Sequence, residues 1–186
     1  EVYSLAYLVA SVLCVMSLGG LASQTTARLG NAWGQIGAFA GILGTIGMLS
    51  HGLPPAVFGQ MAICSAIGGS VGFYIANSIA PTQLPQLVAA FHSFVGLAAV
   101  MVSIAGHIIE ATHFATNPIG GVQQFAIFWG NVIGGVTFTG SIVAFLKLAE
   151  MKSSAALSLP GKDFINLGTL AATLGLFGWY IAPGMT

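Results

Sequence analysis

Charged side chains are scarce in this sequence. Only four of its 186 residues are Lys or Arg and four are Asp or Glu, which makes 4% charged residues, whereas a soluble domain carries roughly 25%. No formally charged residue occurs between Arg28 and Glu110. One membrane-spanning helix needs about 20 apolar residues, so this interval alone has room for about three of them. The shortage of charge excludes a water-soluble surface and a basic patch for nucleic acid.

Cysteines are also few, and the motifs of soluble nucleotide or metal sites are missing. Both cysteines, Cys14 and Cys64, fall inside apolar stretches, where a thiol acts as a small packing group. The sequence has no G-x-G-x-x-G after a strand, no phosphate-binding loop and no Cys/His cluster with metal-ligand spacing. Segment 68–72 is rich in glycine but lies inside an apolar stretch, and we interpret it as a helix-packing face. We expect this chain to bind neither a metal nor a nucleotide cofactor and to contain no catalytic residue.

Apolar residues and glycine are abundant instead. Hydrophobic residues make up 56% of the chain, its mean hydropathy is +0.92, and 26 residues are glycine. Small residues let membrane helices approach closely, which favours a helical bundle over a barrel. The sequence therefore predicts an all-α, polytopic transmembrane helix bundle of about six helices. We expect the spans near residues 3–21, 31–49, 57–79, 85–109, 123–148 and 164–182.

The basic residues predict the orientation of the bundle. Arg28, Lys147, Lys152 and Lys162 all belong to the first and fifth loops, whereas the second and fourth loops contain no Lys or Arg. Short loops rich in Lys and Arg face the cytoplasm or the mitochondrial matrix. We therefore expect the odd-numbered loops on that inner side. The simplest domain description is a single transmembrane domain over residues 1–186.

His92 is the most informative polar residue because it lies inside the fourth predicted span. At 100° per residue, Gly96, Ala99 and Ser103 fall within about 40° of it and form a stripe of small residues. Larger apolar residues cover the opposite side of this helix, namely Leu87, Phe94, Leu97, Met101 and Ile108. We therefore expect His92 to point into the bundle and Gly96, Ala99 and Ser103 to pack against other helices.

Two roles for His92 are open from its chemistry alone. An ionisable group at membrane depth is costly unless paired, so it tends to be functional. An unperturbed imidazole titrates near pH 6.5, which suits a proton relay. The alternative is a neutral histidine that bonds to a neighbouring Ser, Thr or backbone carbonyl and holds helices together.

A second polar face is predicted on the fifth span. Asn131, Gly134, Thr137 and Ser141 lie within about 120° of one another on a helical wheel. They are candidates for a water path opposite His92, and Gly134 and Gly135 are candidates for helix packing. The alternative for the hydroxyl groups is a bond to their own backbone or to a neighbouring helix.

The remaining histidines are interpreted as surface residues. His51 and His113 fall in predicted loops, and His107 lies at the end of the fourth helix beside Glu110. His92 and His107 share one helix about 22 Å apart, so they cannot sandwich one haem.

Several long blocks resemble the membrane domain of proton-translocating NAD(P) transhydrogenases. Residues 84–100 read LPQLVAAFHSFVGLAAV, and residues 134–145 read GGVTFTGSIVAF. Residues 159–162 (LPGK) and 25–31 (TTARLGN) add two shorter matches. The blocks follow the family's order over nearly the whole chain. The residues of these blocks resemble the beta-subunit type and are more similar to mitochondrial members of the family than to many bacterial ones.

The resemblance implies that hydride passes from NADH to NADP⁺ in soluble domains while a proton crosses the membrane domain. In this family the histidine of the F-H-S-F-V-G-L block conducts the proton, which maps onto His92. The serine of the T-F-T-G-S block lies near the channel and maps onto Ser141. With Asn131 and Thr137 of the polar face, these residues form the predicted proton-translocation set.

The resemblance also implies what the chain does not contain. The family's membrane domain continues with further helices, including a polar asparagine that works with the histidine, and then with the NADP(H) domain. We therefore expect this chain to be the N-terminal part of a larger membrane domain, as a fragment or as one product of a split gene. Alone it is expected to hold the proton site without catalysing hydride transfer, with NAD and NADP bound by partner domains.

The expected partners are the lipid bilayer, the remaining transhydrogenase helices and nucleotide-binding domains, and a second copy in a homodimer or larger complex. Nucleic acid is not an expected partner. The expected location is the mitochondrial inner membrane, with the bacterial cytoplasmic membrane as the alternative. A rival interpretation is a non-catalytic accessory subunit of a respiratory or ATP-synthesising complex. An independent solute transporter ranks last, because it would need substrate-binding polar clusters and broken helices at mid-membrane.

Overall fold

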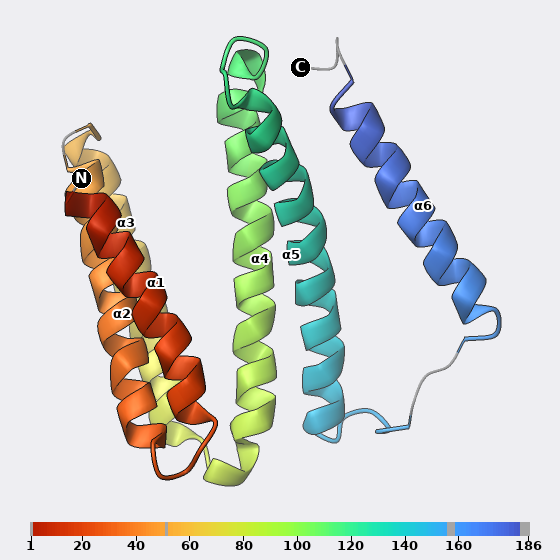
Figure 1. Ribbon diagram of the computed structural model, residues 1–186. Coiled ribbons are helices and arrows are strands. Elements are labelled where there is room, and N and C mark those ends of the chain that lie inside the picture. The colour runs from red at the N-terminus through yellow and green to blue at the C-terminus, as the bar shows by residue number, and fades with distance from the viewer. Residues whose placement is uncertain (1, 51, 156–158, 183–186) are drawn as a thin grey trace. The chain divides into compact units, whose positions relative to one another are not determined.

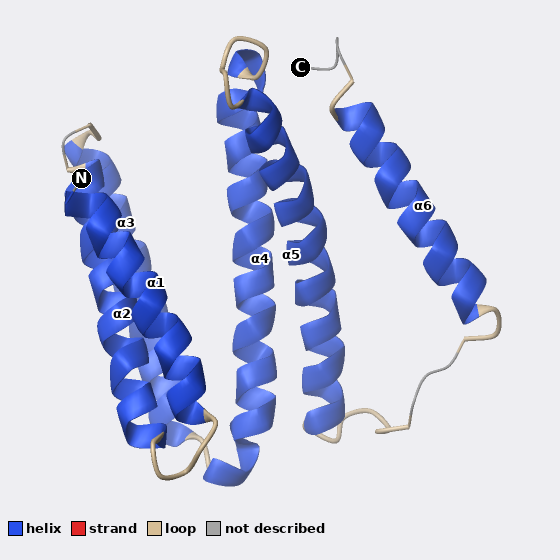
Figure 2. Cartoon of the chain, viewed as in Figure 1, coloured by secondary structure: helices blue, strands red, loops and turns tan. Residues whose placement is uncertain are grey.

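Helices make up all the regular structure that the computed structural model describes, which covers residues 2–50, 52–155 and 159–182 (Figures 1 and 2). Two short 3₁₀ turns, η1 (Pro81–Gln83) and η2 (Ala111–His113), flank the fourth helix. The long helices are α1 (Val2–Leu21), α2 (Ala27–Leu49), α3 (Pro55–Ser78), α4 (Leu84–Glu110), α5 (Gly120–Leu148) and α6 (Lys162–Tyr180). The all-helical fold class is therefore confirmed.

Five of these helices, α1 to α5, are long and apolar enough to cross a membrane. Their bounds lie close to the predicted spans because turn residues mark the connections. Pro55 opens α3, and Pro85 sits in the first turn of α4, where a missing backbone N–H costs no helical hydrogen bond. The chain is therefore an integral membrane protein.

The sixth helix departs from the sequence prediction. It forms over 19 residues, but it is not among the described helices apolar enough to count as a membrane span. Its first turns carry Lys162, Asp163 and Asn166, and these polar side chains offset the apolar residues that follow. The helix starts after Gly161, which adopts a left-handed backbone conformation with φ 74°.

The described helices group into two compact units, Glu1–Tyr74 and Ile75–Thr186. Helix α3 runs from the first unit into the second. A single transmembrane domain in the assembled protein stays a prediction.

In the first unit, α1 and α2 pack closely through small residues. A β-carbon placed on Gly20 would lie 2.6 Å from the Cα of Gly30, so only hydrogen fits there. At the other end of the pair, the Tyr7 hydroxyl donates a hydrogen bond of 3.0 Å to Oγ1 of Thr45. The buried positions of α2 are Gly30, Gly37 and Gly44, which are spaced by seven residues. A seven-residue spacing keeps one stripe of a helix against an antiparallel neighbour that crosses at a small angle.

Helix α3 has no buried residue among those described. Nothing lies within 4 Å of a β-carbon placed on Gly68, Gly69 or Gly72. The predicted packing role of this glycine-rich segment is therefore not fulfilled by the described helices.

In the second unit, α4 and α5 form an antiparallel pair (Figure 1). Gly96 is pressed against the backbone of α5, since a β-carbon on it would lie 2.5 Å from the Phe138 nitrogen. Gly134 is similarly close to α4, because a β-carbon on it would lie 3.0 Å from the Ala99 Cβ. The buried residues of the pair again repeat by seven, as Gly96 and Ser103 on α4 and Gly134 and Ser141 on α5.

Helix α6 touches the α4–α5 pair near its own C-terminal end. The Phe177 ring lies 5.1 Å from the Phe128 ring and 5.7 Å from the Phe125 ring, measured between centroids. The Trp129 ring lies 5.9 Å from the same phenylalanine. By contrast, Phe164 near the start of α6 is 84% exposed. An aromatic cluster therefore attaches the C-terminal end of this helix to its unit.

Candidate functional site

His92 lies in the interior of α4, about 12 Å along the axis from the start of the helix at 1.5 Å per residue. The residue is exposed, whereas its neighbour Ser93 is buried at 7% exposure. The sequence predicts that His92 points into the helix bundle, but in the structure it is not covered by the described helices of its unit. The contact with α5 is centred on Ser93 and Gly96, and His92 borders it on the same turn.

No hydrogen-bond partner contacts His92 within the part of the chain that the structure describes. The adjacent Ser93 hydroxyl donates to the Ala90 carbonyl oxygen at 2.6 Å and so is already used within its own helix. A role as polar glue between the described helices therefore has no support from contacts.

The antiparallel register decides which polar residues of α5 share a level with His92. Gly96 on α4 faces Phe138 on α5. Because the helices are antiparallel, the residue three positions before Gly96 is level with the residue three positions after Phe138. This places Ser141, which is 9% exposed, level with Ser93 and one position from His92. The hydroxyl predicted beside the histidine is therefore at its depth.

Thr137 and Asn131 have different positions. Thr137 is half-buried. Asn131 is exposed and lines a cavity with Ser103 and His107. About 15 Å of helix separates it from Ser141, at 1.5 Å per residue. It therefore lies opposite the C-terminal half of α4 rather than opposite His92.

The predicted packing residues divide in the same way. Gly96, Ala99, Ser103 and Gly134 all lie in the α4–α5 contact, where Gly130 approaches the Ser103 hydroxyl oxygen. Nothing lies within 4 Å of a β-carbon placed on Gly135, so this residue faces away from α4. The contact alternates glycine with serine and leaves no room for water around Gly96.

The other histidines do not behave alike. His113 is exposed in η2, where its Nδ1 lies 3.2 Å from Oγ1 of Thr112, in agreement with a surface residue. His51 falls outside the described residues. His107 is half-buried, and its Nδ1 lies 3.0 Å from the Tyr180 hydroxyl oxygen. The prediction of a surface histidine is wrong for His107. No periodicity within α4 signals a partner 73 residues away.

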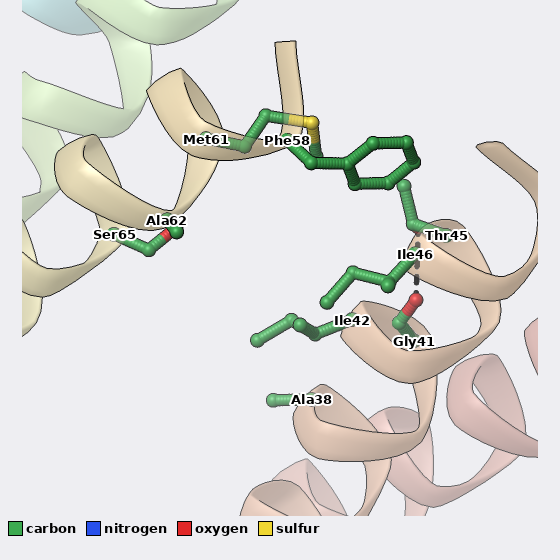
Figure 3. Close-up of a pocket in the computed structure, with 9 residues that line it drawn as sticks. All are labelled: Ala38, Gly41, Ile42, Thr45, Ile46, Phe58, Met61, Ala62 and Ser65. Atoms are coloured by element: carbon green, nitrogen blue, oxygen red, sulfur yellow. Dashed lines mark hydrogen bonds between the residues drawn. The ribbon is translucent and has the colours of Figure 1, made fainter. Parts of the chain in front are cut away.

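A larger cavity of about 730 Å³ lies between α2 and α3 in the first unit (Figure 3). Apolar side chains such as Ile42, Ile46 and Phe58 dominate its lining. Thr45 is one of two hydroxyl residues there, and its hydroxyl already donates to the Gly41 carbonyl oxygen at 2.9 Å. This lining offers little to recognise a polar substrate, and none of the predicted site residues belongs to it.

Comparisons with known proteins agree with the blocks seen in the sequence. The model of the family described as NAD(P) transhydrogenase beta subunit matches residues 3–185. Two curated proteins of Rhodospirillum rubrum, both named NAD(P) transhydrogenase subunit beta, are 36% identical to the chain over 160 residues. The matched region covers 83% of this chain and 33% of each relative, so the chain spans about a third of the length of these relatives.

The family match runs through both units and includes α4 and α5 with His92 and Ser141. With five apolar helices of membrane-spanning length, the matched part is a membrane part. The chain belongs to the NAD(P) transhydrogenase beta subunit family.

Proposed function

We propose that this chain forms the proton-conducting part of a transhydrogenase and that His92 carries the proton. The observation that supports this most is the position of His92 inside a membrane-spanning helix, exposed and without a hydrogen-bond partner among the described residues. An isolated imidazole at this depth is costly against lipid. We infer that further membrane helices of the assembled enzyme cover the exposed face of α4 and enclose water that reaches the imidazole of His92.

The α4–α5 contact gives His92 a fixed support. Gly96 and Gly134 bring the two backbones together, and the buried hydroxyls of Ser93 and Ser141 lie at the level of the imidazole. Because the contact is closed around Gly96, the proton does not travel between α4 and α5. Its route lies along the exposed face of α4, with His92 as the titrating group.

We propose that hydride transfer takes place in nucleotide-binding domains of the assembled enzyme, which bind NAD and NADP. Protonation of His92 and nucleotide binding to those domains then share one coupling free energy. Protonation changes the nucleotide affinity by the same factor by which the nucleotide changes the proton affinity of His92. We propose a homodimer or larger assembly in the mitochondrial inner membrane, or in the cytoplasmic membrane of a bacterium such as the matched relatives. In both membranes the basic loops lie on the matrix or cytoplasmic side.

His92→Ala tests the proposal in the assembled, reconstituted enzyme. Proton transfer by a positioned side chain is worth about 10²–10⁴ in rate, so we expect proton-coupled transhydrogenation to fall by at least about 100-fold. Proton uptake is measured with a pH-sensitive dye inside proteoliposomes, beside the rate of NADPH formation. His113→Ala, which alters an exposed histidine in the second unit, should leave both rates unchanged. Wild-type pumping by His92→Ala would refute the role of His92.

A further inference from the structure

A second titratable cluster lies at the other end of α4, away from His92. His107 stands in the last turn of the helix, and its Nδ1 is 3.0 Å from the hydroxyl oxygen of Tyr180 on α6. The ring centroid of Tyr180 lies 5.6 Å from that of the imidazole, and that of Phe114 lies 6.3 Å away. Both bonded residues are half-buried. This contact holds the ring in one orientation.

The cluster lines a cavity of about 210 Å³ between α4, α5 and α6. At roughly 30 Å³ of liquid volume per molecule, the space admits several waters. Ser103, Asn131, His107 and Tyr180 supply hydroxyl, amide and imidazole groups to its lining. The other lining residues are apolar, namely Ile104, Ile127 and Phe128. A water in this cavity therefore has partners on three helices.

The chemistry of the His107–Tyr180 pair permits both charge states of the imidazole. A tyrosine hydroxyl is donor and acceptor, and a neutral imidazole is both as well. When the ring gains a second proton, both nitrogens become donors, and Nδ1–H donates to the Tyr180 oxygen. The bond survives protonation, so Tyr180 orients the ring without restricting it to one state.

The surroundings contain few competing charges. On α4 itself, Glu110 lies three residues further along, and η2 contributes His113. Helix α6 contributes Tyr180, and the α5 residues of the cavity carry no titratable group. The basic-residue count predicts that this end of α4 faces the outer aqueous phase, opposite the basic loops.

We propose that His107 is a second proton carrier, which loads protons from the outer side before they reach His92, with Tyr180 as its positioning residue. This inference rests on the proposed function. The close approach of Gly130 to Ser103 closes the α4–α5 contact at the inner edge of the cavity. The loaded proton therefore leaves His107 along the exposed face of α4, about 22 Å from His92 at 1.5 Å per residue.

His107→Gln in the assembled enzyme tests this role, because glutamine retains hydrogen bonding but does not titrate. The proton-coupled rate in proteoliposomes is measured while the outer pH is varied from about 5 to 8, the window in which histidine changes charge. We expect the rate to fall by about tenfold or more and its dependence on outer pH to flatten. His113→Gln is the matched control and should retain the wild-type profile.

A profile of His107→Gln that coincides with the wild type and with His113→Gln would overturn the inference. If His107→Gln does not accumulate in the membrane, Tyr180→Phe decides. A displaced outer-pH profile supports loading at His107, whereas an unchanged profile means that the pair only attaches α6. The failure of either proposal is distinguishable, because His92→Ala alone tests whether the enzyme uses His92.

Discussion

At the residue scale, Gly96 and Gly134 set the distance between α4 and α5. Because both residues lack a side chain, the two backbones come close together. A methyl group on Gly96 or Gly134 would clash with backbone atoms of the facing helix, such as the nitrogen of Phe138. Backbone cannot move aside as a flexible side chain can. The neighbouring Gly135, for which the sequence also predicts a packing role, has open space around it.

Gly96→Ala and Gly134→Ala should therefore destabilise the protein by about 1–3 kcal/mol each, the usual cost of overpacking. Gly135→Ala should be neutral or stabilising by up to about 1 kcal/mol, because alanine restricts the unfolded chain. The free energy of unfolding is measured by denaturant titration in detergent micelles. Equal effects of Gly134→Ala and Gly135→Ala would contradict the described face of α5.

At the element scale, an aromatic cluster attaches the C-terminal end of α6, beside the contact between Tyr180 and His107. Phe177→Ala removes the ring contacts with Phe125, Phe128 and Trp129. We expect a loss of about 1.5–4.5 kcal/mol, since each of these aromatic pairs contributes about 0.5–1.5 kcal/mol. Phe164→Ala alters the same helix at an 84% exposed position and should cost little. Proteolysis within residues 149–161 measures the detachment of α6. Equal protection of both variants would show that the cluster does not attach the helix.

The helices themselves are predictable from the sequence, whereas their register is not. Apolar length and turn residues such as Pro55 and Pro85 locate α1 to α5 within a few residues. A helical wheel of α4 predicts a packed stripe of His92, Gly96, Ala99 and Ser103. The last three do lie in the α4–α5 contact, but beyond Gly96 the contact includes Ser93 rather than His92. A single helix does not reveal which of two adjacent stripes meets a neighbour.

Contacts between residues far apart in the sequence are even harder to predict than the helix register. The Tyr180 hydroxyl meets His107 across 73 residues, and only the packing of three helices brings them together. The position of Asn131 has the same cause, because its level on α5 depends on where α4 and α5 cross. An imidazole in the last turn of an apolar helix is a signal for His107, but it does not identify a partner.

At the scale of the whole molecule, the orientation in the membrane follows from four basic residues and is open to direct measurement. Single cysteines are introduced as Ser23→Cys, Ala115→Cys and Ser153→Cys after Cys14 and Cys64 have been replaced by serine. All three target positions are exposed in loops. A membrane-impermeant maleimide applied from outside should label only Ala115→Cys. Labelling of Ser23→Cys or Ser153→Cys without permeabilisation would reverse or refute the orientation.

The seven-residue repeat of small side chains has a mechanical consequence for the α4–α5 pair. Glycine meets backbone at Gly96 and Gly134, so sliding α4 past α5 by one turn would drive larger side chains into those positions. We therefore expect the two helices to move as a rigid body. In the proposed mechanism, a displacement that transmits nucleotide state to His92 therefore tilts or rotates this pair as a whole, with the strain taken up in the connecting segments.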